Sequence, residues 1–209
     1  MEPSLSGVLG LMQLTDSALP TGAFSHSLGF ETYMHAEQLE DRESFSAWLE
    51  MFVDQQLTHT DALAVRLVYA AEDFERVEDL DDLVTVQALP RQIREGGMTM
   101  GGRLLSIGAR SYPGEWVQRY EQGVVEERLH GHQATVWGVL ARELGVPEDT
   151  AVASHVYATV ISLTQNAVRG IPLGQNTGQA VIRDAQDWVG RAVAVSRDLV
   201  AQGLSLIHI

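Results

Sequence analysis

Histidine is the residue type in this sequence best suited to metal binding or acid–base chemistry. His130 and His132 form a His-Gly-His element. In a helix of 3.6 residues per turn their side chains would diverge by about 200°, so they could share a metal ion only in an extended loop. A third ligand at a useful local spacing is not evident. The pattern therefore favours a structural or partner-binding role, while His35, His59 and His155 lie in helical patterns and are predicted to be packing or surface residues.

Hydroxyl groups lie beside an imidazole in the segment Phe24-Ser25-His26-Ser27. A serine nucleophile of the hydrolase type would need a Gly-x-Ser-x-Gly turn after a strand, and the sequence offers neither. Short polar clusters of this kind commonly begin a helix, because a side-chain oxygen can accept from a free backbone N–H. We therefore expect Ser25 or Ser27 to cap a helix that runs through Glu31 to His35.

An enzymatic alternative would place a metal ion at His26, His130 or His132, with Glu31 as a general base. It predicts a histidine-based, metal-dependent hydrolase. The sequence has no cysteine, which excludes thiolate ligands and disulfides, and its basic residues are all arginine, which excludes Schiff-base chemistry. We expect no catalytic residue, no metal site and no cofactor, and so a protein that is not an enzyme.

Glycine pairs at 96–97 and 101–102 bracket Met98-Thr99-Met100 and invite comparison with phosphate-binding loops. The run follows a helical pattern rather than a strand, and it contains no lysine, so both the dinucleotide and the P-loop patterns fail. We expect the glycines to interrupt the helical pattern and to serve either close helix approach or a mobile loop.

Composition limits the class of protein and the kind of partner. The 209 residues are 45% hydrophobic and 20% charged, which is typical of a chain with a packed core. The formal net charge of -14 repels phosphate backbones and anionic lipids, so nucleic acid and membrane are unfavourable partners. We find no N-terminal leader and no run of 18 apolar residues. A cytoplasmic protein is expected.

Helical spacing of apolar residues extends along most of the chain, while no segment alternates as a strand would. The clearest stripe covers residues 45–57, and a second covers 63–74 with Asp61 as its N-cap; the two are predicted to be antiparallel neighbours or one kinked helix. Further stripes cover residues 80–87, 136–144, 152–167 and 182–200. The sequence predicts an all-α fold, a single-domain bundle over residues 1–209 with roughly ten helices.

Two segments, 14–31 and 165–179, mix polar, turn and apolar residues without a clean stripe. In the second, Gln175 and Gln179 lie one turn apart and could present their amides from one helix face. The segments could form an interaction surface, or the second could be an internal hydrogen-bonded helix junction.

Four segments carry a resemblance to a known family. The first is Leu-Pro-Thr-Gly-Ala-Phe-Ser-His-Ser-Leu-Gly-Phe-Glu at 19–31, and the second is Arg91-x-x-Arg94-Glu95 followed by Gly-Arg-Leu-Leu at 102–105. The third is Gly-His-Gln-Ala-Thr-Val-Trp-Gly at 131–138, and the fourth contains Pro-Leu-Gly-Gln-Asn-Thr-Gly-Gln at 172–179. Together and in this order they resemble the urease accessory protein UreF family.

The resemblance implies an all-α homodimer that binds UreD (also called UreH) and the GTPase UreG, and helps deliver nickel to apo-urease in the cytoplasm with GTP hydrolysis. It implies a chaperone or scaffold for urease maturation, with nickel as the cargo. By the residue match, the candidates for the partner-binding surface are Gly22, Phe24, His26, Ser27, Glu31, Arg169, Pro172, Gly174, Gln175, Gly178 and Gln179. Family members continue beyond the point that corresponds to residue 209, so we expect the C-terminal tail to be truncated.

Overall fold

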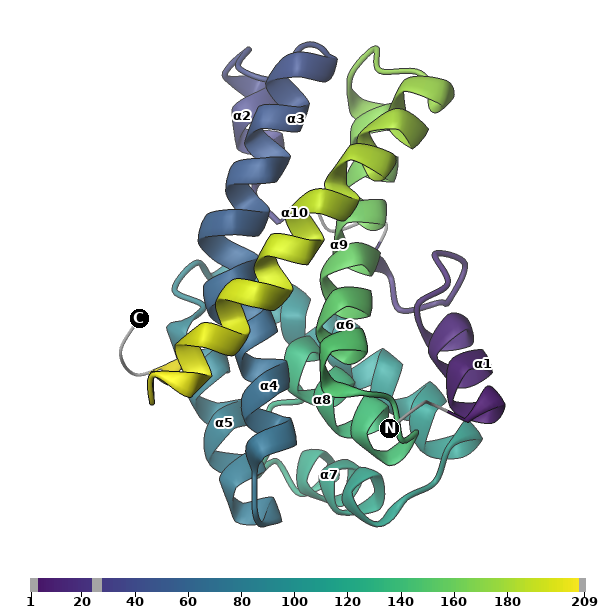
Figure 1. The fold of residues 1–209 in the computed structure, drawn as a ribbon, viewed down its shortest axis with the longest axis vertical. Helices are drawn as coiled ribbons and strands as arrows, with labels where there is room; N and C mark the ends of the chain where they lie inside the picture. Colours follow the sequence, from purple (N-terminus) through teal and green to yellow (C-terminus); the bar gives the residue numbers. More distant parts are fainter. Residues whose placement is uncertain (1–3, 24–27, 207–209) are drawn as a thin grey trace.

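The computed structural model describes residues 4–23 and 28–206, and within them it consists of helices and their connections, with no strand (Figure 1). The elements are α1 (Leu5–Leu14), α2 (Phe30–His35), α3 (Arg42–Met51), η2 (Phe52–Ala62), α4 (Leu63–Ala70), α5 (Phe74–Gln87), α6 (Arg91–Ser111), α7 (Glu115–Val125), α8 (Gln133–Glu143), α9 (Glu148–Gly170) and α10 (Gln175–Ala201). The predicted all-α fold is confirmed. No helix in the described ranges is both long enough and apolar enough to cross a bilayer.

The helices α3, η2 and α4 follow one another without a break and form a rod along the long axis of the molecule (Figure 1). The middle section, η2, is a π-helix, in which the Thr58 hydroxyl donates to the Val53 carbonyl five residues earlier at 2.7 Å. The prediction that Asp61 is an N-cap was wrong, because Asp61 lies inside η2. The predicted second helix also ends early: the Asp73 carboxylate accepts from the Arg76 amide at 2.9 Å and starts α5 at Phe74.

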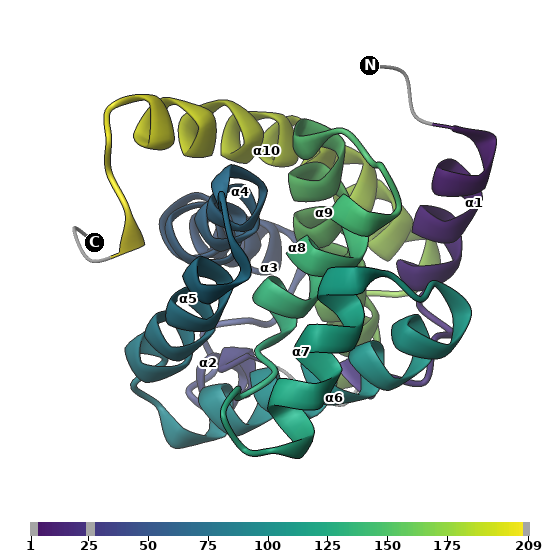
Figure 2. The ribbon, with the colours of Figure 1, turned by 90° about the horizontal axis from the view of Figure 1, so that it is seen from below.

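Helix α8 lies at the centre of the molecule and packs against α4, α6, α7 and α9. Its Val136, Trp137 and Leu140 side chains are buried, and the Trp137 indole N–H donates to the Ala151 carbonyl at 2.8 Å. Helix α10 crosses α9, η2, α4 and α3 on one side, and α6 and α7 lie on the other side (Figure 2). The core is therefore formed by helices packed on both sides of α8 and the rod.

Helix α6 runs through all the glycines that were predicted to interrupt it. Of the two uses expected for them, close approach is confirmed at Gly97 and Gly101: a Cβ at Gly97 would lie 2.9 Å from the His132 Nε2, and one at Gly101 would lie 2.0 Å from the Gly131 carbonyl oxygen. Gly108, later in α6, also packs closely, since a Cβ there would lie 2.5 Å from the Leu140 side chain of α8. Each glycine costs a helix about 1 kcal/mol relative to alanine. The tight packing of α6 against its neighbours offsets this cost.

A buried arginine, Arg66 of α4, joins this helix to α9 and α10. Arg66 is 1% exposed, and its guanidinium donates to Glu148 at 2.9 Å and to Asp149 at 2.8 Å, at the N-terminus of α9. It also donates to the Ser196 hydroxyl at 2.8 Å and to the Val193 carbonyl at 2.7 Å, both on α10. A buried cation requires such partners, so Arg66 ties the N-terminus of α9 and the later part of α10 to α4.

Candidate functional site

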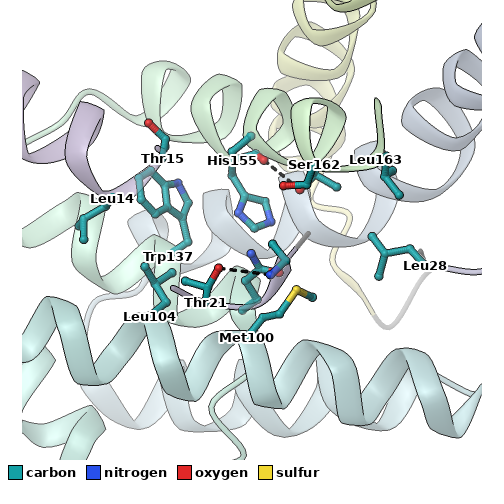
Figure 3. A pocket seen from close by; sticks show the side chains of 14 residues that line it. Leu14, Thr15, Thr21, Leu28, Met100, Leu104, Trp137, His155, Ser162 and Leu163 are labelled. Atoms are coloured by element: carbon teal, nitrogen blue, oxygen red, sulfur yellow. Dashed lines mark hydrogen bonds between the residues drawn. The ribbon is translucent and has the colours of Figure 1, made fainter. Parts of the chain in front are cut away.

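A small cavity lies beneath the N-terminal segment, residues 15–23, where this segment passes over α6, α8 and α9 (Figure 3). Its volume is about 60 Å³. The lining residues come from the end of α1, the chain between α1 and α2, and helices α6, α8 and α9. They are Leu14, Thr15, Thr21, Ala23, Leu28, Met100, Leu104, Gln133, Trp137, His155, Ala158, Thr159, Ser162 and Leu163. The cavity is too small for a cofactor, which needs several hundred Å³. It instead marks the point where the first three family-like segments meet.

The first three of these segments contact one another around the cavity. Arg103, from the second segment, donates to the Thr21 carbonyl of the first at 3.3 Å. Its neighbour Leu104 faces the cavity beside Trp137 of the third segment (Figure 3). Gly22 is buried with a φ of 82°, a left-handed conformation that glycine adopts without strain. The described part of the N-terminal segment is thus held against α6 and α8.

The fourth segment meets α2 at the far end of α9. A Cβ at Gly170 would lie 2.7 Å from the Met34 methyl group, so the end of the Met34 side chain of α2 lies directly against Gly170. The connection turns at Gly174, whose φ is 70°, and α10 begins at Gln175. Gly178 packs against α9, because a Cβ there would lie 2.7 Å from the Val168 side chain. The break at 171–174 is therefore a compact helix junction that touches α2.

The predicted partner-binding residues divide into three groups. Phe24, His26 and Ser27 lie outside the described residues, as does the predicted helix cap at Ser25 or Ser27; α2 begins at Phe30 with Gly29 as its N-cap. Buried members of the set are Gly22 and Gly178. Exposed members are Glu31, Arg169, Pro172, Gly174, Gln175 and Gln179. The exposed members other than Glu31 thus lie at the α9–α10 junction, and Glu31 lies near the beginning of α2.

Gln175 and Gln179 are exposed on successive turns of α10, as expected for a helix that begins at this point. Arg169, in the last turn of α9, donates to the Asn166 side chain one turn earlier. The junction therefore has internal hydrogen bonds and also presents amide groups to solvent. The structure thus shows a helix junction with an internal hydrogen bond, and the alternative of an interaction surface stays a prediction.

The His-Gly-His element is an extended loop held by one buried carboxylate, Asp81 of α5. Asp81 accepts backbone N–H bonds from His130 at 2.6 Å, Gly131 at 3.2 Å and His132 at 2.9 Å, and a hydroxyl bond from Tyr120 at 2.5 Å. Its side chain is fully buried. Burial and the charge of Asp81 raise the pKa of Tyr120 well above its ordinary value, so the phenol stays protonated as the donor.

The two histidine side chains of this loop have different hydrogen-bond partners. The His132 Nδ1 accepts from the Ala134 amide at 3.3 Å and caps α8, while its Nε2 would lie 2.9 Å from a Cβ at Gly97. His130 is exposed and pairs with Asp82 at 3.1 Å. Within residues 4–23 and 28–206 no three histidine, aspartate or glutamate side chains are grouped to hold a metal ion.

The buried His132 makes stability depend on pH. Burial lowers the pKa of His132 below its ordinary 6.5, so the unfolded chain binds a proton first as pH falls. The free energy of unfolding should therefore decrease below about pH 6.5, by up to about 1.4 kcal/mol per pH unit. His132→Asn keeps an acceptor for the cap and removes the titration. Urea unfolding at pH 7 and pH 5 should show a smaller loss for this variant.

The exposed His35 provides the control for this experiment, because His35→Asn removes a histidine that solvent already surrounds. This variant should lose as much stability between pH 7 and pH 5 as the original chain. If His132→Asn and His35→Asn show the same pH dependence, the account of the buried imidazole is wrong.

A second buried histidine joins the rod to α9. His155 Nε2 lies 3.0 Å from an Asp61 carboxylate oxygen, and its ring stacks on Trp137 with centroids 6.4 Å apart. Burial opposes ionisation of Asp61, yet the hydrogen bond and charge of His155 outweigh it and lower the pKa of the carboxyl group. Because His155 also lines the cavity, this pair connects η2 to the wall beneath the N-terminal segment.

Sequence reasoning missed the role of Asp81 and of the Asp61–His155 pair. One signal was available for Asp81: it follows Leu80 and precedes Val84 on the apolar stripe of α5, where a carboxylate is costly unless it has several donors. For Asp61 and His155, far apart in the sequence and on different helices, we find no such signal. Their pairing follows from the packing of α9 on the rod.

Comparison with known proteins shows the relationship directly. A model of the UreF family matches residues 39–186. The urease accessory protein UreF of Kocuria rhizophila is 88% identical over 205 residues, covering 98% of this chain and 88% of that protein. Those of Corynebacterium efficiens and Paenarthrobacter aurescens are 52% and 50% identical, covering 93% and 91% of this chain and 85% and 84% of the relatives. The chain therefore belongs to the UreF family of urease accessory proteins.

Proposed function

We propose that the chain serves urease maturation as a non-enzymatic scaffold that acts as a single domain. In this role it binds UreD/UreH and the GTPase UreG, assists GTP-dependent insertion of nickel into apo-urease, and works as a homodimer in the cytoplasm, where GTP is available. Nickel is the cargo of this process. The specific partners and the dimer come from the family resemblance.

The observation that carries the proposal is the convergence of the family-like segments. Arg103 holds the backbone at Thr21, and Met34 of α2 touches Gly170 at the end of α9. These contacts join the helices that carry two exposed polar side chains, Glu31 on α2 and Gln175 on α10. Such a surface can bind a protein without a reactive centre.

The alternative of a histidine-based hydrolase is not supported. His132 is buried and occupied as a helix cap, and His130 pairs with Asp82 on the surface. Glu31 lies on α2, whereas both histidines lie on the loop before α8. The relatives are named urease accessory proteins. We therefore propose that urease activation depends on binding by this chain and not on turnover.

The double variant Gln175→Ala, Gln179→Ala tests the proposed surface. Both side chains are exposed, so the fold should be unchanged, while loss of two amides at an interface is expected to weaken partner binding about tenfold or more. Binding to UreD/UreH and UreG would be measured by co-purification and titration. Urease activation would be measured in the same reconstituted system.

The matched control is Gln118→Ala, Gln122→Ala, which removes two exposed glutamines one turn apart on α7. Helix α7 lies at the opposite end of the molecule from α2 (Figure 1). The control should bind and activate normally. If the α10 variant also retains both activities, the fourth segment is not an interaction surface.

A further inference from the structure

A groove runs between the beginning of α2 and the first half of α6. Its volume is about 690 Å³, much larger than that of the cavity beneath the N-terminal segment. The residues that line it are Leu28, Gly29, Glu31, Thr32, Pro90, Gln92, Ile93, Glu95, Gly96 and Thr99. A space of this size accommodates several side chains of a bound segment.

The chemistry of the groove is apolar with an acidic edge. Leu28, Pro90 and Ile93 supply the apolar surface, and Glu31 and Glu95 supply carboxylates. Glu95 pairs with Arg91 at 3.0 Å, but both side chains are exposed and such pairs are weak. Glu31 has no ion pair among the described residues, and none of the described lining side chains is cationic. The groove is thus complementary to a segment that carries positive charge.

An exposed apolar residue precedes the groove residue Pro90 at the α5–α6 turn. Leu89 is 82% exposed and directly precedes Pro90. The turn is held in place by Arg94, whose guanidinium donates to the Ala88 carbonyl at 2.9 Å and to the Leu89 carbonyl at 3.4 Å. A large apolar side chain presented on a fixed turn is a feature of binding surfaces.

The backbone at the opposite wall is strained. Leu28 has a φ of 48° and Gly29 a φ of 98°, and a leucine rarely adopts the left-handed region. Leu28 lines both the groove and the inner cavity, so it separates the two. Strained residues of this kind cluster at ligand-binding sites. This observation points to the groove independently of its charge.

We propose that this α2–α6 groove is the docking surface for a partner segment that carries arginine or lysine next to an apolar anchor residue. The inference rests on the proposed scaffold function and specifies which part of the surface the partner's cation contacts. The apolar anchor lies against Leu28 and Ile93, and the cation lies beside Glu31 and Glu95. Because like charges repel across an interface, the groove also disfavours acidic segments.

Opposite substitutions at Gln92 test the proposal. Gln92 is exposed at the groove edge in the first turn of α6, so either change should leave the fold intact. Gln92→Arg should weaken binding to the maturation partners about tenfold, and Gln92→Glu should strengthen it about threefold, both effects shrinking in high salt. Dissociation constants for UreD/UreH and UreG would be measured by titration at two salt concentrations. A purely structural role for Gln92 would not give effects of opposite sign.

The matched control is the same pair of changes at Gln118, exposed in the first part of α7. Neither should change binding more than twofold. A photoreactive amino acid at position 92 would identify the bound segment, and the expected cross-link is to a partner peptide that contains arginine or lysine. Cross-linking to a second copy of this chain, or equal effects of the two Gln92 changes, would overturn the proposal.

The experiment also separates this inference from the scaffold function. If the original chain binds its partners and the Gln175, Gln179 variant weakens binding while the Gln92 variants do not change it, the groove proposal fails and the scaffold function stands. If the original chain binds neither partner, the scaffold function fails and the groove proposal fails with it.

Discussion

Replacing Asp81 by alanine is expected to lower the free energy of unfolding by about 4 kcal/mol. The change removes one buried carboxylate and leaves three backbone N–H groups and the Tyr120 hydroxyl without their acceptor. Each unsatisfied buried group costs about 1 to 3 kcal/mol, and some of the donors will regain water when the loop loosens. Urea unfolding followed by circular dichroism would measure the effect.

Two further variants sharpen this experiment. Asp82→Ala removes the neighbouring carboxylate, which is 71% exposed and pairs with His130, and should cost less than about 1 kcal/mol. Asp81→Asn keeps a side chain of similar shape with one acceptor oxygen, so its loss in free energy of unfolding should lie between those of Asp81→Ala and Asp82→Ala. A loss of less than about 1 kcal/mol for Asp81→Ala would show that the His-Gly-His loop does not depend on this anchor.

Gly101→Ala is expected to destabilise the protein by at least about 3 kcal/mol, although alanine is the best helix former. The new Cβ would lie 2.0 Å from the Gly131 carbonyl oxygen and 2.7 Å from the Gln133 amide nitrogen. Both obstacles are backbone atoms of a loop that Asp81 holds, so they cannot rotate away. Helix α6 must therefore separate from the loop. Thermal and urea unfolding would measure the loss.

The next residue of the same helix supplies the control. A Cβ at Gly102 would meet nothing within 4 Å, so Gly102→Ala should stabilise the protein by up to about 1 kcal/mol through helix propensity alone. Adjacent glycines should thus respond with opposite signs. If both alanine variants are stabilising, the close contact between α6 and the loop is absent in solution.

Much of the fold could be predicted because apolar residues at helical spacing indicate helices directly. The stripes at 80–87, 152–167 and 182–200 lie in observed helices, and the stripe at 136–144 does so up to its last residue, Leu144, which is the C-cap of α8. Gly145 directly follows the 136–144 stripe, and glycine is the residue that commonly follows a helix end because it adopts the left-handed conformation; its φ is 67°. These signals depend on residues close together in the sequence.

The remaining features depend on contacts between distant residues. The period of an apolar stripe does not separate a π-helix from an α-helix over so short a segment, so Asp61 was assigned to a cap. Glycines that break a helix and glycines that let it approach a neighbour look alike until the neighbour is known, as in α6. The four family-like segments were identified from the sequence, but the contacts among the first three around the cavity and the contact of the α9 end with α2 were not.

The contact between Met34 and Gly170 has a consequence for biosynthesis. It joins α2, made early, to the end of α9, made late, so the closing loop spans most of the chain. During translation the N-terminal half emerges from the ribosome without α9 and α10. The proposed surface around Gln175 and Gln179 is therefore absent from a nascent chain, and we expect partners that need it to bind only after α10 has been released.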